Sequence, residues 1–587
     1  MARTNSRPLG TEHIPDYIAW PMRTAAVSLG AFAVVVFLLL ASYEGAPSSG
    51  TLTSWEEPLQ YAALTTAFLG YLIALRWEGA GGGIMLIGAI GLGVLASVEF
   101  EPMFSLAAVL AFLVPAVLFL LRWQRTQPLY SIASLAVVLT LLLAGGWYGA
   151  DQIYSYYWGP THPESSVELP SVDLVEWSWA GAVTSDGVTV NAETTHATDR
   201  VRLAVSESAD FIDPVYSGFA EARDDETEEI VSMQVSGLDP DTAYYYAIEV
   251  DGRLDEGRRG SFRTFPEGAS SFTFAVASCA RTGSNGAVFD AIRSHNPLFY
   301  MMTGDFHYQN IDRNDIDAML DAYGEQLTQP AQQALYGTTP VTYTWDDHDY
   351  GGDGSDSASP ARPGITQAYR YAVPHYDLPS LEGAIYQAFS AGRVRFIVLD
   401  TRSERSPVSM PDGPDKTMLG AEQKAWLKEQ LLAAADQYPL IVIVSSVPWI
   451  DKDTAGADTW AGYATERREL ADFIAGNGID GLLMLNGDAH MVAIDDGTNS
   501  DYSTNGGAAF PVLHAAPLDK RGSEKGGPFS EGAYQGSGQF GLVTVEDSGT
   551  TISVTLSGRD YEDEEIVGYE FTVPEQLPRS ATTASGA

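Results

Sequence analysis

Apolar residues follow two different patterns along the chain, and the change comes near residue 150. Before that point lie long apolar stretches, at residues 25–43, 58–75, 82–98, 104–121 and 130–147. None has Asp, Glu, Lys or Arg in its interior, and each is close to the ~20 residues that a helix needs to cross ~30 Å of hydrocarbon. The pattern therefore predicts a five-helix transmembrane anchor over residues 1–150.

The arginines between these stretches predict an orientation. Arginine lies before the first stretch, between the second and third, and between the fourth and fifth, whereas the other connections and residues 126–199 contain neither Lys nor Arg. Positively charged connections stay on the cytoplasmic side. The prediction is a multi-pass protein of the cell membrane, with a cytoplasmic N-terminus and an extracellular catalytic domain. Because no stretch holds a charged residue in its interior, an anchor is favoured over a transporter.

After residue 150 the apolar runs become short. Residues 151–169 contain Pro and Ser without periodicity, which predicts a juxtamembrane linker. In residues 170–266, alternating runs recur about every 10 residues with turn residues between them, and this pattern predicts a β-sandwich. The segment VSGLDPDTAYYYAIEVDG (235–252) resembles the fibronectin type III pattern. That resemblance implies a fibronectin III-like or Ig-like fold and says nothing about chemistry.

From residue 270 to 575, apolar strand-like runs alternate with helical patterns. The strand-like runs are residues 272–278, 298–303, 341–345, 395–400, 440–446 and 481–486, and the clearest helical patterns are residues 421–436 and 465–476. Such alternation predicts an α/β domain with buried sheets. The runs FGLVTVE, TISVTLSG and YEFTV predict closing antiparallel strands, and the polar residues 576–587 predict a disordered tail.

Charge is concentrated after residue 150. Residues 151–587 contain 27 Lys or Arg against 68 Asp or Glu, a net charge of −41, and only six residues of the chain are Lys. An acidic, lysine-poor surface suits concentrated salt, where the Debye length falls to about 3 Å. This halophile interpretation is favoured over an ordinary acidic secreted protein. The negative field also argues against a nucleic-acid-binding surface.

Four predicted strands end in residues that commonly bind metals. Cys279 follows the first, and the segments GDFHY (304–308), WDDHD (345–349) and NGDAH (486–490) follow others. Strand ends at one edge of a sheet converge in space. Carboxylates suit hard cations, imidazole suits transition metals, and thiolate with phenolate indicates a softer or redox-capable ion. The set therefore predicts a mixed centre in which Asp305 could bridge two ions about 3.5–4 Å apart.

These segments, in this order, resemble the alkaline phosphatase D (PhoD-like) group of calcineurin-like metallophosphoesterases. The resemblance also includes AYRYAVP (368–374), FIVLDTRSER (396–405), the LGAEQKAWLKEQL helix and VIVSSVPW (442–449), and it covers roughly residues 170–570. It implies a ββ-sandwich flanked by helices in residues 270–575. It also implies a metal-dependent phosphatase or phosphodiesterase.

Carried over residue by residue, the resemblance implies the following roles. Cys279 and Tyr308 would bind Fe³⁺, with Asp305 bridging to a companion ion, Ca²⁺; Mn²⁺, Mg²⁺ and Zn²⁺ are the alternatives. Asp347, Asp488 and His490 would complete the metal ligands. His348 would contact the phosphate and protonate the leaving alcohol. Arg281 is the second catalytic candidate, and it stands where the family commonly has other polar residues.

One rival interpretation is a non-catalytic cell-surface binding or adhesion protein that retains a relic phosphatase fold. The four metal-ligand clusters argue against it. Monoesterase and diesterase activity stay equally open, because the loops that build a substrate pocket cannot be folded from the sequence. The expected partners are a phosphate ester substrate and the membrane, with no obligate protein partner.

Overall fold

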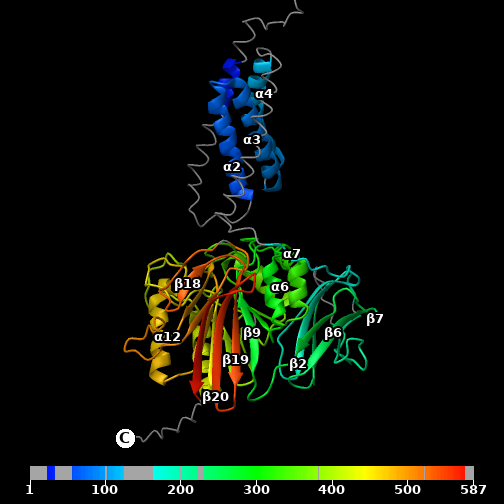
Figure 1. Ribbon diagram of the computed structural model, residues 1–587, viewed down its shortest axis with the longest axis vertical. Coiled ribbons are helices and arrows are strands. Elements are labelled where there is room, and N and C mark those ends of the chain that lie inside the picture. Colours follow the sequence, from blue (N-terminus) through cyan, green and yellow to red (C-terminus); the bar gives the residue numbers. More distant parts are fainter. Residues whose placement is uncertain are drawn as a thin grey trace, which may run out of the picture. The chain divides into compact units, whose positions relative to one another are not determined.

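A computed structural model describes residues 23–32, 56–99, 102–124, 163–198, 200–220, 229–380, 383–520 and 522–574. The chain divides into two compact units, Met1–Tyr157 and Trp158–Ala587 (Figure 1). Each is described by itself.

The first unit is helical. Residues 23–32 form a helical segment, followed by α2 (Glu56–Ala74), α3 (Glu78–Glu99) and α4 (Pro102–Gln124). Apolar side chains of all these helices pack together, among them Ala26, Tyr71, Met85 and Phe119. Arg122 at the end of α4 forms an ion pair with Glu78 at the start of α3.

The transmembrane prediction is wrong for the part of the chain that the structure describes. No helix there combines the length and the apolar character needed to cross a membrane. A crossing takes ~20 apolar residues in one helix, whereas α2 begins with Glu56 and Glu57 and α3 is partly glycine. The sequence prediction rested on apolar stretches of 17–19 residues without interior charge, which are at the short end of that length. The multi-pass localisation, with a cytoplasmic N-terminus and an extracellular catalytic domain, is contradicted with it.

Several other predictions fall on residues outside the described ranges. These are the end of the first apolar stretch, the whole of the fifth, most of the linker at 151–169, and the tail at 576–587.

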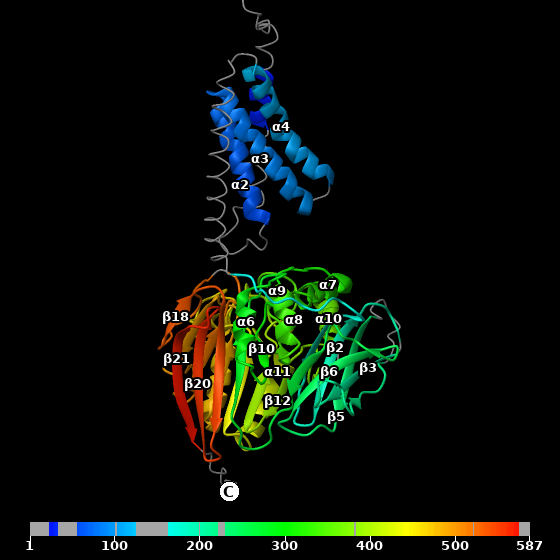
Figure 2. The ribbon, with the colours of Figure 1, turned by 45° about the vertical axis from the view of Figure 1, so that its right-hand side comes forward.

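The second unit contains a nine-stranded sheet (Figure 2). Its strands, in spatial order, are β21 (Glu565–Pro574), β20 (Thr551–Asp560), β19 (Gln539–Asp547), β9 (Phe272–Ala277), β10 (Tyr300–Met302), β11 (Val341–Tyr343), β1 (Val175–Gly181), β2 (Gly187–Thr194) and β5 (Ile230–Ser236). Strands β9, β10 and β11 run parallel to one another. The predicted closing strands at the C-terminal end are confirmed as β19, β20 and β21, which pair antiparallel.

A seven-stranded sheet forms the second layer. Its strands, in spatial order, are β12 (Gln387–Ala391), β13 (Val394–Val398), β14 (Leu440–Ser445), β15 (Leu482–Asn486), β17 (Val512–Ala515), β16 (Met491–Asp495) and β18 (Gly532–Gln535). Strands β13, β14, β15 and β17 are parallel. The six strands and two helices predicted from apolar runs after residue 270 are all present, within a few residues of the predicted bounds.

Apolar side chains of the two sheets meet in one core, in which Phe274 and Val276 of β9 pack with Phe396 and Val398 of β13. Helices cover the outer faces. Helices α6 (Ala287–Ser294), α7 (Ile316–Leu327), α8 (Pro330–Tyr336) and α10 (Arg362–Ala372) share a core with the nine-stranded sheet, and α11 (Gly420–Ala435) and α12 (Ala464–Asn477) share one with the seven-stranded sheet. The layers are therefore a ββ-sandwich with helices on both sides.

The segment predicted as a separate sandwich contributes to two sheets. Strands β1, β2 and β5 extend the nine-stranded sheet, because β1 pairs in parallel with β11 through Gly181 and Val341. The remaining strands form a small sheet of β4 (Val215–Tyr216), β3 (Val201–Ser206), β6 (Ala243–Val250), β7 (Arg253–Leu254) and β8 (Gly260–Arg263). The domain bounds at 170–266 and 270–575 stay predictions.

Candidate active site

The carboxyl ends of β9, β10 and β15 come together, so Cys279, Asp305 and Asp488 approach one another from distant parts of the chain. The Cys279 amide donates to the Gly304 carbonyl at 3.1 Å, and the Ala280 amide donates to the Asp305 carbonyl at 2.9 Å. All three residues have positive φ angles, 64°, 53° and 68°. Non-glycine residues adopt this left-handed conformation at an energetic cost, and such residues gather at functional sites.

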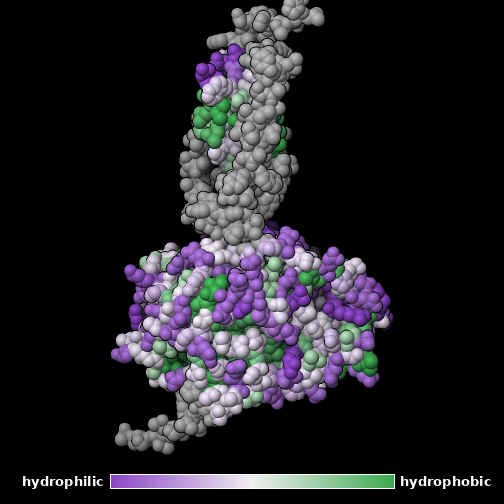
Figure 3. Space-filling model, viewed as in Figure 1, coloured by the Kyte–Doolittle hydropathy of each residue, from purple (hydrophilic) through white to green (hydrophobic). Residues whose placement is uncertain are grey.

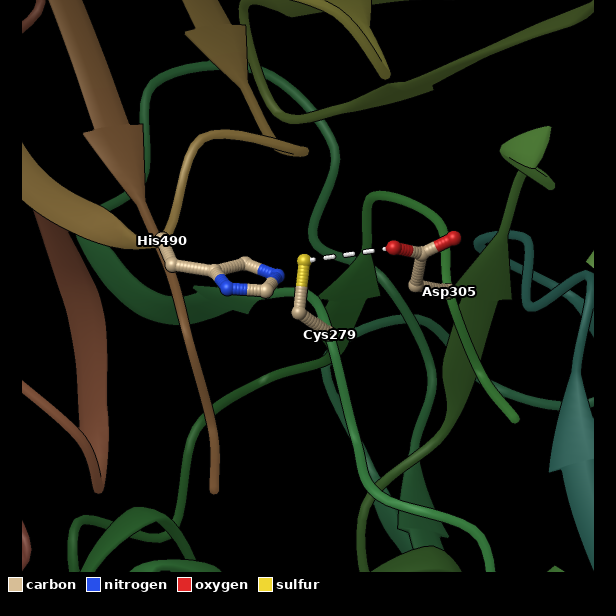
Figure 4. Close-up of side chains that lie close together, drawn as sticks. All are labelled: Cys279, Asp305 and His490. Carbon is tan, nitrogen blue, oxygen red and sulfur yellow. Dashed lines mark hydrogen bonds between the residues drawn. The ribbon is translucent and has the colours of Figure 1, made fainter. Parts of the chain in front are cut away.

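The first group of potential metal ligands joins Cys279, Asp305 and His490, whose donor atoms lie within 4.8 Å of one another (Figure 4). The Cys279 Sγ is 3.5 Å from Asp305 Oδ2. Tyr308 reaches the same place, because its hydroxyl donates to Asp305 Oδ2 at 2.7 Å and lies 3.1 Å from His490 Nε2. Thiol, phenol, imidazole and carboxylate therefore converge.

The second group joins Asp305, Asp347 and His348, again with donor atoms within 4.8 Å. Asp347 and His348 begin the short helix α9 (Asp347–Tyr350) directly after β11. The His348 amide donates to Asp347 Oδ1 at 2.9 Å and lies 3.3 Å from Asp305 Oδ1. Asp305 thus belongs to both groups, as the bridging ligand of a two-metal site would.

The His348 side chain is held by a residue that the sequence interpretation did not select. Its Nδ1 lies 2.6 Å from Asn310 Oδ1, an atom that can only accept, so Nδ1 carries the proton. The Nε2 atom is then the one that can bind a metal or exchange a proton with a substrate. Burial lowers the pKa of His348 to about 4, against the opposing charge of Asp347.

Two predicted site residues lie outside both ligand groups. Asp488 Oδ1 accepts a hydrogen bond from Lys525 Nζ at 2.9 Å, while Oδ2 is buried without a hydrogen-bond partner among the described residues. Arg281 is half-buried, and its backbone amide donates to Asp519 Oδ1 at 2.5 Å. Burial raises the pKa of Asp519, while the positive charge of Arg281 lowers it.

The donor set fits a dimetal centre. Burial and neighbouring carboxylates raise the pKa of Cys279, Asp305 and Tyr308 well above the usual values. Such buried acids remain protonated unless positive charge compensates them. Cations would supply that charge, and they would also satisfy the unpartnered Asp488 Oδ2.

Comparisons with known proteins decide the family. Residues 274–537 match the model of the family described as PhoD-like phosphatase. These residues form a domain of the PhoD-like phosphatase family.

Individual relatives agree with this membership. Alkaline phosphatase D of Bacillus subtilis (strain 168) is 24% identical over 311 residues, which are 44% of this chain and 53% of that protein. The matched region therefore spans about half the length of that relative. A solved structure of PhoD has a TM-score of 0.56 at 18% identity and covers 72% of this chain and 94% of that chain. Purple acid phosphatase PPD1 from yellow lupin (Lupinus luteus) seeds has a TM-score of 0.52 at 14% identity, covering 69% and 74%. These two structures have the same fold as the matched part of this chain.

Behind the ligands of the PhoD-like domain lies a buried ion-pair network around Arg402. The backbone amide of Arg402 donates to Asp400 Oδ1 at 3.0 Å. Its guanidinium, however, donates to Asp346 Oδ1 at 2.5 Å and Asp458 Oδ2 at 2.9 Å. The network holds the loop after β11, which carries Asp347.

Sequence reasoning also missed two lysines of the PhoD-like domain. Lys520 Nζ lies 3.7 Å from the ring centroid of Tyr308, and Lys525 binds Asp488. Burial lowers the pKa of Lys520 to about 8, although the Asp305 and Asp519 carboxylates act in the opposite direction. No motif marks these positions. The one signal in the sequence is that lysine is rare, with six in the chain, and that two of the six lie within six residues of each other.

Proposed function

We propose that this chain is a metal-dependent phosphoesterase that hydrolyses phosphate esters with water. The observation that carries the proposal is the shared position of Asp305 in two groups of potential metal ligands, at the strand ends of a PhoD-like domain. A carboxylate placed between two cations is the arrangement by which hydrolytic enzymes stabilise both the attacking and the leaving oxygen. The negative charge of the chain disfavours nucleic acid as a substrate.

The two ligand groups differ in their donor atoms, and each group therefore suits a different kind of metal ion. Cys279, Tyr308 and His490 offer sulfur, phenolate and imidazole beside Asp305, a set that suits Fe³⁺. Asp305 and Asp347 offer carboxylate oxygens, which suit Ca²⁺, with Mn²⁺, Mg²⁺ and Zn²⁺ as alternatives. When bound, such ions polarise the phosphoryl group and activate water.

The residues of the chain have separate tasks in this proposal. Asn310 fixes the ring of His348 through Nδ1, so that Nε2 faces the reacting group. Nε2 can protonate the leaving oxygen from the imidazolium form of His348, which the negative charge of a bound phosphate ester stabilises. Arg281 orients the phosphate with its guanidinium, which matches phosphate geometry. The buried ion pair between Asp346 and Arg402 keeps the loop that carries Asp347 in place.

The test combines metal analysis with activity on paired substrates. The full chain, purified without chelators, should contain two or more metal ions per chain and should hydrolyse an aryl phosphate monoester, the matching diester, or both. Removal of metal by a chelator should abolish turnover, and iron with calcium should restore more of it than other pairs. A protein that binds no metal and cleaves neither substrate would overturn the proposal and would favour the non-catalytic binding role.

A further inference from the structure

The segment between β17 and β18 places two lysines beside the candidate site. Its backbone is attached to neighbouring elements by several hydrogen bonds, including Leu518 N to Ser278 O at 2.9 Å and Ser523 N to His490 O at 2.8 Å. These two bonds tie the segment to the residues next to Cys279 and to His490 itself. Lys520 and Lys525 are therefore held at the ligands rather than on a distant loop.

The two lysines differ in their partners. Lys525 is bound to Asp488, and 47% of its side chain is exposed. Lys520 is only 9% exposed. Its ammonium group packs on the ring of Tyr308, and among the described residues it has neither a hydrogen bond nor a carboxylate within 4.0 Å. An ammonium carries three donors, and no protein acceptor among the described residues takes any of those of Lys520.

Lys520 also lies near the group expected to act on the substrate. The Tyr308 ring, on which the Lys520 ammonium packs, lies with its centroid 4.2 Å from that of the His348 ring. A phosphate whose leaving oxygen lies at His348 is therefore close to the Lys520 ammonium. In a chain whose net charge of −43 repels phosphate esters, such a buried cation supplies a local attraction that the surface lacks.

We propose that Lys520 binds the phosphate group of the substrate, with its ammonium donating to a non-bridging phosphate oxygen. The inference rests on the proposed phosphoesterase function and adds a substrate-binding residue to it. The phosphate supplies the acceptors that the structure leaves missing around Lys520. Tyr308 serves as the platform that fixes the direction of the lysine side chain, since a cation on an aromatic face is held there electrostatically.

The test compares Lys520→Gln and Lys520→Arg with Lys428→Gln as the matched control. Lys428, on α11, forms an ion pair with Glu469 at 2.6 Å, and its substitution removes the same charge without touching a site residue. For each protein, metal content, kcat, KM for an aryl phosphate monoester and the inhibition constant of inorganic phosphate are measured. Lys520→Gln should keep its metal and raise KM and the phosphate inhibition constant about 10–100-fold, the worth of one charge-assisted hydrogen bond. Lys520→Arg should recover part of that loss, and Lys428→Gln should match the wild type.

The other outcomes are decisive. An unchanged phosphate inhibition constant in Lys520→Gln, with an active wild-type enzyme, overturns the role of Lys520 and leaves the phosphoesterase function intact. A loss of bound metal in Lys520→Gln overturns it as well, because the lysine would then support the ligands rather than the substrate. A wild-type protein that neither cleaves esters nor binds inorganic phosphate overturns both proposals.

Discussion

The hydroxyl of Tyr308 donates a hydrogen bond to Asp305 Oδ2 at 2.7 Å, and the Tyr308 hydroxyl oxygen also lies 3.1 Å from His490 Nε2. One phenol thus connects the carboxylate shared by both ligand groups to an imidazole from the other sheet. The Cys279 thiol lies 3.5 Å from the same carboxylate oxygen. A cation placed among these atoms would replace the phenolic hydrogen as the link between them.

We expect Cys279→Ser and Tyr308→Phe to lower bound iron and activity together. Each substitution removes one ligand of the first group while changing the side-chain volume little. Loss of a residue that only supports a metal ligand typically lowers metal affinity or activity about 10–100-fold. Loss of a ligand itself should lower metal affinity and turnover by about 10-fold or more. Metal analysis and turnover of the same preparations are the measurements.

Tyr438→Phe is the control for this pair, because its hydroxyl bonds Ser390 at the edge of the seven-stranded sheet. It should leave metal content and turnover unchanged. Wild-type metal and wild-type rates in both Cys279→Ser and Tyr308→Phe would mean that these residues only pack at the strand ends.

The strand-end ligands could be located from the sequence because parallel strands fix where their carboxyl ends meet. Cys279, Asp305 and Asp347 each follow a continuous apolar run, and a buried parallel strand is the simplest reading of such a run. Lys520 could not be found this way. Its place beside Tyr308 depends on the path of a loop between β17 and β18, and loop paths are set by contacts distant in sequence, such as that of Leu518 with Ser278.

The prediction for the N-terminal unit failed for a different reason. An uncharged apolar stretch such as residues 82–98 satisfies a rule based on apolar length and missing charge. The structure instead packs Met85 and Leu92 of α3 against Tyr71 and Phe112 of the neighbouring helices. An apolar stretch of marginal length can be a membrane span or a helix buried by other helices. Periodicity alone does not distinguish a membrane span from a buried helix.

His348→Ala should separate a proton donor from a metal ligand. If Nε2 acts on the substrate, the variant should keep its metal and lose about 10²–10⁴-fold in turnover, the usual worth of general acid–base catalysis. The loss should be smaller for esters with an acidic leaving alcohol, because such an alcohol departs without a proton.

Metal content and rates for a series of aryl and alkyl phosphates are the measurements. His375→Ala, outside both ligand groups, should behave like the wild type. An equal loss across all leaving groups, accompanied by loss of metal, would instead assign His348 to the second metal group.

Arg402→Met should destabilise the fold by about 3–5 kcal/mol, the cost of breaking a buried ion pair from one side. Arg402 is fully buried and faces Asp346 and Asp458, so its loss leaves the Asp346 carboxylate without compensation. Adding Asp346→Asn should recover part of the loss. Free energies of unfolding in denaturant would measure both effects.

The exposed pair Arg263–Asp241, with both side chains 52% exposed, is the matched control. Arg263→Met should cost less than about 1 kcal/mol, because water screens such pairs. A cost for Arg402→Met no larger than that of the control would show that the buried network adds nothing to stability.

Stability and activity should rise toward molar salt. Hydrophilic residues are spread over the visible face of the second unit (Figure 3), and residues 151–587 carry a net charge of −41. Mutual repulsion is screened when the Debye length falls from about 10 Å at 0.1 M to about 3 Å at 1 M. Melting temperatures in sodium chloride, with sucrose of equal osmolality as the control for general exclusion effects, would test this. Identical melting temperatures at 0.1 M and 1 M salt would contradict it.

His514 should make the fold sensitive to mild acid. This residue of β17 is fully buried, its Nε2 lies 2.6 Å from the Ala489 carbonyl, and its Nδ1 has no hydrogen-bond partner among the described residues. Burial lowers the pKa of His514 from 6.5 to about 3. Between these values the unfolded chain binds a proton that the folded chain does not. The contribution of neutral His514 to stability is therefore complete above pH 6.5 and decreases as the pH falls toward 3, by up to about 1.4 kcal/mol per pH unit.

His514→Gln removes this titration while leaving every other acid in place, so the difference between variant and wild type isolates it. The variant should be less stable at pH 7, because packing around β17 is disturbed, yet its free energy of unfolding should fall less steeply between pH 6.5 and 4.5. Urea unfolding of both proteins at several pH values in that range is the measurement. Parallel pH curves for the two proteins would show that His514 takes up a proton in the folded state without cost, which its burial in the described structure does not allow.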